Sequence, residues 1–177
     1  MRNDDIDEII PHLFISNWNT SNNSNIISTN NIKSVITLET SEKPKEILDY
    51  YRNHNIDFTY IKIPDSPNEN IGKYFDLTFD LIENKISKGE NVLVHCFAGV
   101  SRSSTIVLNY LIKKFYMTNS NSKLKDPVNI LNKTLEFSKT KRSVINPNQG
   151  FLNQLLRKTI QYSNEYFRTE YFCMRKH

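Results

Sequence analysis

The sequence is poor in cysteine and has no long apolar run. Only two cysteines occur among its 177 residues, Cys96 and Cys173, and the four histidines are scattered. This is too few ligands for a structural zinc site, and we expect two reduced thiols rather than a disulfide framework. No stretch approaches the roughly eighteen apolar residues of a membrane span. The start of the chain is acidic and lacks the features of a secretion signal. We therefore expect no membrane partner and a cytoplasmic protein, with the nucleus as the alternative.

The composition is that of one globular domain. Hydrophobic residues make up 38% and charged residues 24%, in a chain long enough to bury a core. The net charge of +4 would suit acidic or phosphorylated partners. However, the abundance of Lys, Ile and Asn favours codon bias in an AT-rich genome as its origin. We expect no nucleic-acid partner, and the oligomeric state stays unknown.

Short β-rich runs alternate with helical patterns along the chain. The expected strands are 13–15, a possible edge strand, and 33–38, 58–63 and 91–95; the expected helices are 42–53, 71–86, 102–116, 127–139 and 148–162. Residues 17–31 are polar and predict loops with at most a weak helical turn. The run at 91–95 has no polar residue in its centre, which is typical of a strand buried on both faces. This alternation predicts an α/β domain with a mainly parallel sheet of about four to five strands, flanked by helices.

One segment joins the buried strand to a helix through a short loop. The loop begins at Cys96 and ends at Arg102, where the next helical pattern starts. Ligands of open α/β sheets bind at the carboxyl ends of strands, and helix N-termini attract anions. Amides, helix dipole and Arg102 would favour the thiolate of Cys96, while the guanidinium can hold two phosphoryl oxygens. Gly99 can supply the backbone angle that turns successive amides towards one point.

The same segment resembles the signature loop of the protein tyrosine phosphatase superfamily, which reads His-Cys, five residues, Arg, then Ser or Thr. Its residues are His95-Cys96-Phe97-Ala98-Gly99-Val100-Ser101-Arg102-Ser103-Ser104. The Ala98-Gly99 pair and the ending are most similar to the dual-specificity branch. Alone, Cys96 could be a small buried hydrophobe and His95 a core residue. Together with the other loop residues, they favour a catalytic site.

The resemblance implies a fold and a domain extent. Residues 9–15 and 146–151 are also similar to the branch, and Asn148 would cap the last helix. We expect a protein tyrosine phosphatase-like fold with a mixed sheet and a dual-specificity phosphatase catalytic domain at 8–157. Residues 117–126 would be an insertion, and 158–177 a C-terminal helical extension or tail.

The resemblance also implies residue roles. Cys96 would be the nucleophile, Arg102 would bind the phosphoryl oxygens, and Ser103 would assist breakdown of a cysteinyl-phosphate. The loop would bind substrate through Phe97, Ala98, Gly99, Val100 and Ser101, with His95 as a supporting residue. No metal and no cofactor are expected.

The resemblance also implies a general acid, an aspartate in a loop about thirty residues before the cysteine. Asp65, after the strand at 58–63, fits this place. Its Asp-Ser-Pro context also suits a simple turn. Glu69 is the second candidate, although it lies further from the strand end.

The implied substrate is a phosphorylated protein, with phosphotyrosine and phosphoserine or phosphothreonine accepted in a shallow cleft. We expect this because no segment before the domain is available to build an aromatic wall. The alternatives are RNA 5′ ends, phosphoinositides, and a phospho-binding pseudophosphatase. The loop contains no lysine, which disfavours the lipid, and it keeps Cys96 and Arg102, which disfavours binding alone. The Arg102-Ser103 ending argues against a sulfurtransferase.

Overall fold

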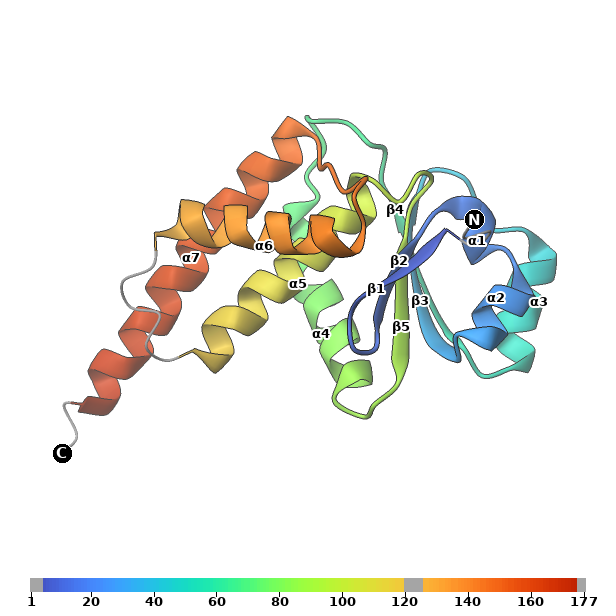
Figure 1. Ribbon diagram of the computed structural model, residues 1–177, viewed down its shortest axis with the longest axis horizontal. Coiled ribbons are helices and arrows are strands. Elements are labelled where there is room, and N and C mark those ends of the chain that lie inside the picture. Colours follow the sequence, from blue (N-terminus) through green and yellow to red (C-terminus); the bar gives the residue numbers. More distant parts are fainter. Residues whose placement is uncertain (1–4, 120–125, 175–177) are drawn as a thin grey trace.

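A five-stranded sheet forms the centre of the molecule. The computed structural model describes residues 5–119 and 126–174, with side chains up to residue 166. The strands lie in the order β1-β2-β5-β3-β4 (Figure 1). They are β1 (Ile6–Ile10), β2 (Leu13–Ser16), β3 (Ile32–Glu39), β4 (Asp57–Lys62) and β5 (Asn91–His95). Four strands run parallel and β1 is antiparallel, so the predicted α/β fold with a mixed, mainly parallel sheet is confirmed.

Strand β2 is not the edge strand that its short apolar run predicted. All four of its residues are buried, because it pairs with β5 on one side and with β1 on the other. The edge strand on this side of the sheet is β1, which the sequence analysis missed. Only Ile9 of β1 is buried, so its pattern is too weak to predict a strand.

Three helices cover the face of the sheet seen at the right of Figure 1: α1 (Trp18–Ser21), α2 (Ser24–Thr29) and α3 (Lys45–Asn53). The first two replace the expected loop. Their N-termini are capped by the side chains of Asn17 and Asn23, which accept hydrogen bonds from backbone amides of the first turn. Helix α3 begins one residue after Pro44, which takes the N-cap position rather than the first turn.

The other face is covered by a short 3₁₀ turn, η1 (Gly72–Tyr74), and four helices. These are α4 (Phe75–Ile86), α5 (Arg102–Thr118), α6 (Pro127–Lys141) and α7 (Gln149–Met174). Helix α7 extends beyond its predicted end at residue 162. Residues 120–125 of the expected insertion and the side chain of Cys173 lie outside the described residues.

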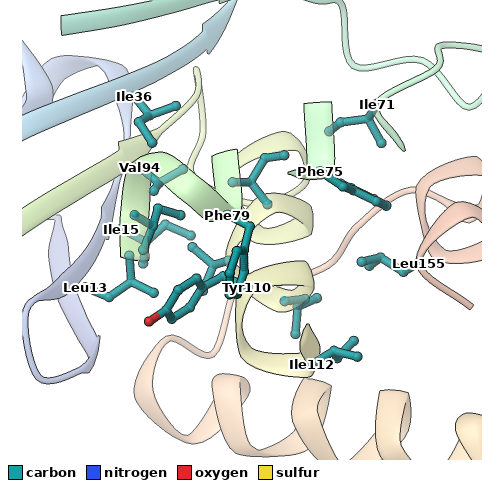
Figure 2. Packing of buried hydrophobic residues seen from close by; sticks show 14 of the residues in the cluster. Leu13, Ile15, Ile36, Ile71, Phe75, Phe79, Val94, Tyr110, Ile112 and Leu155 are labelled. Carbon is teal, nitrogen blue, oxygen red and sulfur yellow. The ribbon is translucent and has the colours of Figure 1, made fainter. Parts of the chain in front are cut away.

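Helix α5 lies in the middle of this layer and is almost wholly buried along its first half. Figure 2 shows Tyr110 and Ile112 of α5 among core residues of the sheet, α4 and α7. A buried polar contact adds specificity: Tyr162 Oη donates to Asn109 Oδ1 at 3.0 Å, and Asn109 Nδ2 donates to the Phe75 carbonyl at 3.1 Å. Helices α4, α5 and α7 are therefore joined at one point.

Strand β5 is buried on both faces, as predicted. Val92 and Val94 pack in the larger core cluster and Leu93 in the cluster under α2 and α3, each with 0% exposure. The strand is flanked by β2 and β3, so its carboxyl end is held from both sides. Within the described residues, no helix is long and apolar enough to span a membrane.

A buried lysine joins α1 to the loop after β3. Lys43 donates to Ser21 Oγ and Asn22 Oδ1, both at 2.7 Å, and its Nζ lies 4.6 Å from the centre of the Trp18 ring. Burial lowers the pKa of Lys43 to about 7, and the charge of Glu39 opposes this shift in part. The ammonium form is therefore disfavoured in the folded protein.

This burial predicts a pH dependence of stability. The unfolded chain holds the Lys43 proton up to about its ordinary pKa of 10.5, whereas the folded protein releases it near pH 7. Between these values the unfolded state binds more protons, so the free energy of unfolding should rise with pH. Lys43→Met removes this contribution. Urea denaturation at about pH 7 and about pH 9 should show the wild type gaining stability relative to Lys43→Met. If the free energy of unfolding differs between the wild type and Lys43→Met by the same amount at both pH values, the prediction is contradicted.

Candidate active site

The loop after β5 surrounds the sulfur of Cys96. The side chain is 1% exposed, and its Sγ accepts a hydrogen bond from the Gly99 amide at 3.2 Å. Ser103 Oγ lies at the same distance on the other side, and it donates when the sulfur is ionised. Both contacts would stabilise a negative charge on the sulfur.

Gly99 is required by the shape of this loop. Its φ is +66°, in the left-handed region that side chains disfavour. A Cβ at this position would lie 2.5 Å from the Ser16 carbonyl oxygen. Any other residue would push the loop away from β2.

The loop ends at the N-terminus of α5. Ser101 takes the N-cap position, but its hydroxyl makes no capping hydrogen bond to the helix. Instead it donates to Asp65 Oδ1 at 2.8 Å. The positive end of the helix dipole thus lies beside Cys96, and this arrangement favours an anion.

Arg102 lies in the first turn of α5 and is held by a buried carboxylate. Its Nη1 and Nη2 donate to Glu39 Oε1 and Oε2 at 3.1 and 3.2 Å, and Nη1 also donates to the Ile63 carbonyl at 3.0 Å. Both side chains are buried. Arg102 Nε is buried as well and has no hydrogen-bond partner among the described residues. A phosphoryl oxygen would satisfy this donor.

His95 supports the loop from the strand and is neutral. Burial, and the nearby charges of Lys43 and Arg102, lower its pKa well below the ordinary value, against a smaller opposing effect of its hydrogen bond to Cys96. Its Nδ1 lies 3.3 Å from the Cys96 carbonyl, which can only accept, so we assign the proton to Nδ1. Thr37 Oγ1 then donates to Nε2 at 2.7 Å. The ring is fixed and is not placed to exchange protons with a substrate.

Asp65 is the carboxylate of the 64–71 loop that contacts the signature loop. Its Oδ1 accepts from Ser101 Oγ and from Asn148 Nδ2, both at 2.8 Å, and the side chain is exposed. Glu69, the second candidate, contributes its backbone carbonyl to Gln154 Nε2 at 2.8 Å. Geometry therefore favours Asp65 over Glu69.

The start of α7 positions the 64–71 loop. Asn148 caps the helix, as expected, by accepting from the Phe151 amide at 3.0 Å, while its amide group holds Asp65. A Cβ on Gly150 would come within 1.9 Å of the Pro67 carbonyl oxygen, so the loop packs directly on the helix backbone. Gln154 binds the loop further along.

Phe97 is the exposed side chain next to Cys96. It is 66% exposed, although its carbonyl is held by the Trp18 amide at 2.9 Å. Its ring is available to a substrate at the rim of the loop.

The sequence analysis missed several residues that hold the signature loop or Arg102 from elsewhere in the chain. They are Trp18, Thr37, Glu39 and Arg142. A charged residue at the end of an apolar strand was a usable signal for Glu39. The others carry no local signal. Among residues 5–119 and 126–166, no group of three or more His, Cys, Asp or Glu side chains could hold a metal ion.

The site thus combines a buried thiol, a backbone N–H that donates to it, a guanidinium and a nearby carboxylate. This set suits transfer of a phosphoryl group to sulfur. Comparisons with known proteins identify the family of the chain. The family model described as "Dual specificity phosphatase, catalytic domain" matches residues 13–161.

Curated relatives and solved structures agree. Dual specificity protein phosphatase 1 of Arabidopsis thaliana is 34% identical over 94% of this chain and 76% of its own length. Dual specificity protein phosphatase 1B of the same plant is 34% identical over 89% of this chain and 84% of its own length. The crystal structure of DUSP15 has 27% identity and a TM-score of 0.74, covering 93% of both chains. The resemblance seen in the signature loop is confirmed, and the chain belongs to the dual specificity protein phosphatase family.

Proposed function

We propose that the chain hydrolyses phosphate monoesters of proteins through a cysteinyl-phosphate intermediate. In the first step the Cys96 thiolate attacks phosphorus, and the bond to the ester oxygen breaks. Arg102 and the loop amides hold the non-bridging oxygens, where charge develops. Asp65 gives its proton to the leaving oxygen, so the product leaves as a neutral alcohol or phenol.

The second step releases phosphate. Asp65, now a carboxylate, takes a proton from a water molecule as that water attacks the cysteinyl-phosphate. The sulfur–phosphorus bond breaks, and Ser103 donates a hydrogen bond to the departing thiolate. Inorganic phosphate leaves, and Asp65 is protonated again for the next cycle.

One observation carries this proposal: the buried Nε of Arg102 has no partner among the described residues, in a site where the Cys96 sulfur accepts a hydrogen bond from the Gly99 amide and lies 3.2 Å from Ser103 Oγ. A buried donor without a partner is uncommon, and an oxyanion on the sulfur would satisfy it. The chemistry also needs a reduced thiol, which supports a cytosolic or nuclear location.

The first prediction concerns the nucleophile. Cys96→Ser should abolish hydrolysis of a generic aryl phosphate, because serine is not ionised at working pH and His95, held by Thr37, is not placed to activate it. Vanadate should inhibit the wild type. Activity should persist in EDTA, since the loop itself supplies the positive field. Loss in EDTA that zinc or magnesium restores would overturn the mechanism.

The second prediction concerns the acid. Asp65→Asn should slow hydrolysis of an aryl phosphate with a poor leaving group by roughly 10²–10⁴-fold. The effect should be much smaller for a leaving group that needs no proton. Glu69→Gln, in the same loop, is the matched control and should behave like the wild type. The reverse pattern would assign the role to Glu69.

The substrate range we propose is dual, and the exposure of two side chains near Cys96 supports a shallow site. Phe97 and Asp65 are both exposed at its rim. A short phosphoserine or phosphothreonine could then reach the sulfur. Phosphotyrosine should still react faster, because its phenol is the better leaving group and its ring can contact Phe97.

The third prediction tests this range with three peptides that differ only in phosphotyrosine, phosphothreonine or phosphoserine. All three should be hydrolysed, with the highest kcat/KM for phosphotyrosine. Phe97→Gln should lower the phosphotyrosine value by roughly two- to tenfold, the worth of an aromatic contact, and change the others less. Activity on phosphotyrosine alone would refute the open site. Faster turnover of a phosphoinositide or a 5′-triphosphorylated RNA would assign the chain another substrate class.

A further inference from the structure

Arg142 follows α6 and lies against the back of the signature loop. Its side chain is 3% exposed. Nε donates to the Gly99 carbonyl at 2.9 Å and Nη2 to the Ala98 carbonyl at 3.4 Å. No step of the proposed reaction uses this residue, yet it is one of the most buried charges in the described part of the chain.

Two carboxylates of the N-terminal strand region hold the other side of its guanidinium. Asp5 accepts from both Nη atoms, and Asp7 Oδ2 accepts from Nη1 at 2.8 Å. A planar guanidinium bound on two edges has a fixed orientation. The direction of its bonds to the loop therefore depends on these two carboxylates.

The geometry of the peptide bond links these contacts to the anion site. In a planar trans peptide, the carbonyl of one residue and the amide of the next point in opposite directions. Holding the Ala98 carbonyl outwards turns the Gly99 amide inwards, and this amide does donate to the Cys96 sulfur. Holding the Gly99 carbonyl outwards likewise turns the Val100 amide inwards.

The neighbouring peptide units are held in the same way by backbone amides. The Trp18 amide donates to the Phe97 carbonyl and the Asn146 amide to the Val100 carbonyl, both at 2.9 Å. His95 holds the Cys96 carbonyl with its side chain at the start of the loop. Arg142 holds both central units with one side chain. A single substitution at position 142 can therefore release two peptide units together.

We propose that Arg142 is a positioning residue for the phosphate cradle, by which we mean the inward-facing amides of Gly99 and Val100 beside Cys96. Through their bonds to Arg142, Asp5 and Asp7 also influence how tightly the site binds an oxyanion. This inference rests on the proposed function, because the oxyanion is the phosphoryl group of the substrate. The alternative is that Arg142 only fastens β1 and α6 to the body of the protein.

The test compares alkylation of Cys96 by iodoacetate and by iodoacetamide, followed on the peptide that contains it. Both reagents need the thiolate, but only the anionic one gains from inward-facing amides. The ratio of the two rates therefore measures how well the inward-facing amides bind an anion, and it does not measure the stability of the fold. Inhibition by vanadate gives an independent value.

Arg142→Met should lower this ratio and weaken vanadate inhibition by about tenfold, the worth of a charge-assisted hydrogen bond. Arg142→Lys keeps one donor and should restore part of the loss. Asp5→Asn with Asp7→Asn should shift both values in the same direction by a smaller factor. This pair serves as the test, beside Arg142→Lys, if Arg142→Met fails to fold.

Asp76→Asn is the matched control. Asp76 pairs with Lys113 and Lys158, so it also joins separate elements through two ion pairs, far from the signature loop in the sequence and outside its hydrogen bonds. It should lower the melting temperature and leave the ratio unchanged. Arg142 and aspartate variants that do the same would show a purely structural role and overturn the inference. A wild type with no preference for iodoacetate and no vanadate inhibition would instead overturn the proposed function.

Discussion

An anion site made of backbone amides imposes a constraint on everything around it. Each inward amide leaves a carbonyl that points outwards, and a buried carbonyl must find a donor. The donors come from α1, from the residue after α6 and from the segment before α7. The loop is short, but its shape depends on segments that lie far from it in the sequence on both sides.

The buried pair of Arg102 and Glu39 meets a second requirement. A guanidinium free to rotate would lose part of its benefit when a substrate arrives, whereas one already held by a carboxylate is preorganised. The arrangement is also vulnerable. Removing the carboxylate would leave a buried charge without its partner, a change that typically costs about 3–5 kcal/mol. We expect position 39 to tolerate little variation while the chain remains active.

The sequence predicted well what is local. Strand, loop and helix from 91 to 116 are continuous in the chain, so period and residue type sufficed, and Asp65 lies at the strand end where it was expected. The sequence could not predict which side chains pair with one another, because Glu39 and Arg102 are 63 residues apart and Arg142 and Asp5 are 137 residues apart. Such contacts depend on sheet order, which no local pattern encodes. The length of α7 was predictable in principle, since neither glycine nor proline follows Gly150.

The docking of the 64–71 loop on α7 has a consequence for motion. Asn148, Gly150 and Gln154 all contact the loop, and they lie within the capped first turns of the helix. The loop cannot leave as an independent lid without breaking the contacts that also order this helix end. Opening of the loop and fraying of the helix should therefore form one cooperative unit, with a shared free energy of local unfolding. In hydrogen exchange, amides of residues 69–72 and of the first turn of α7 would then show matched protection.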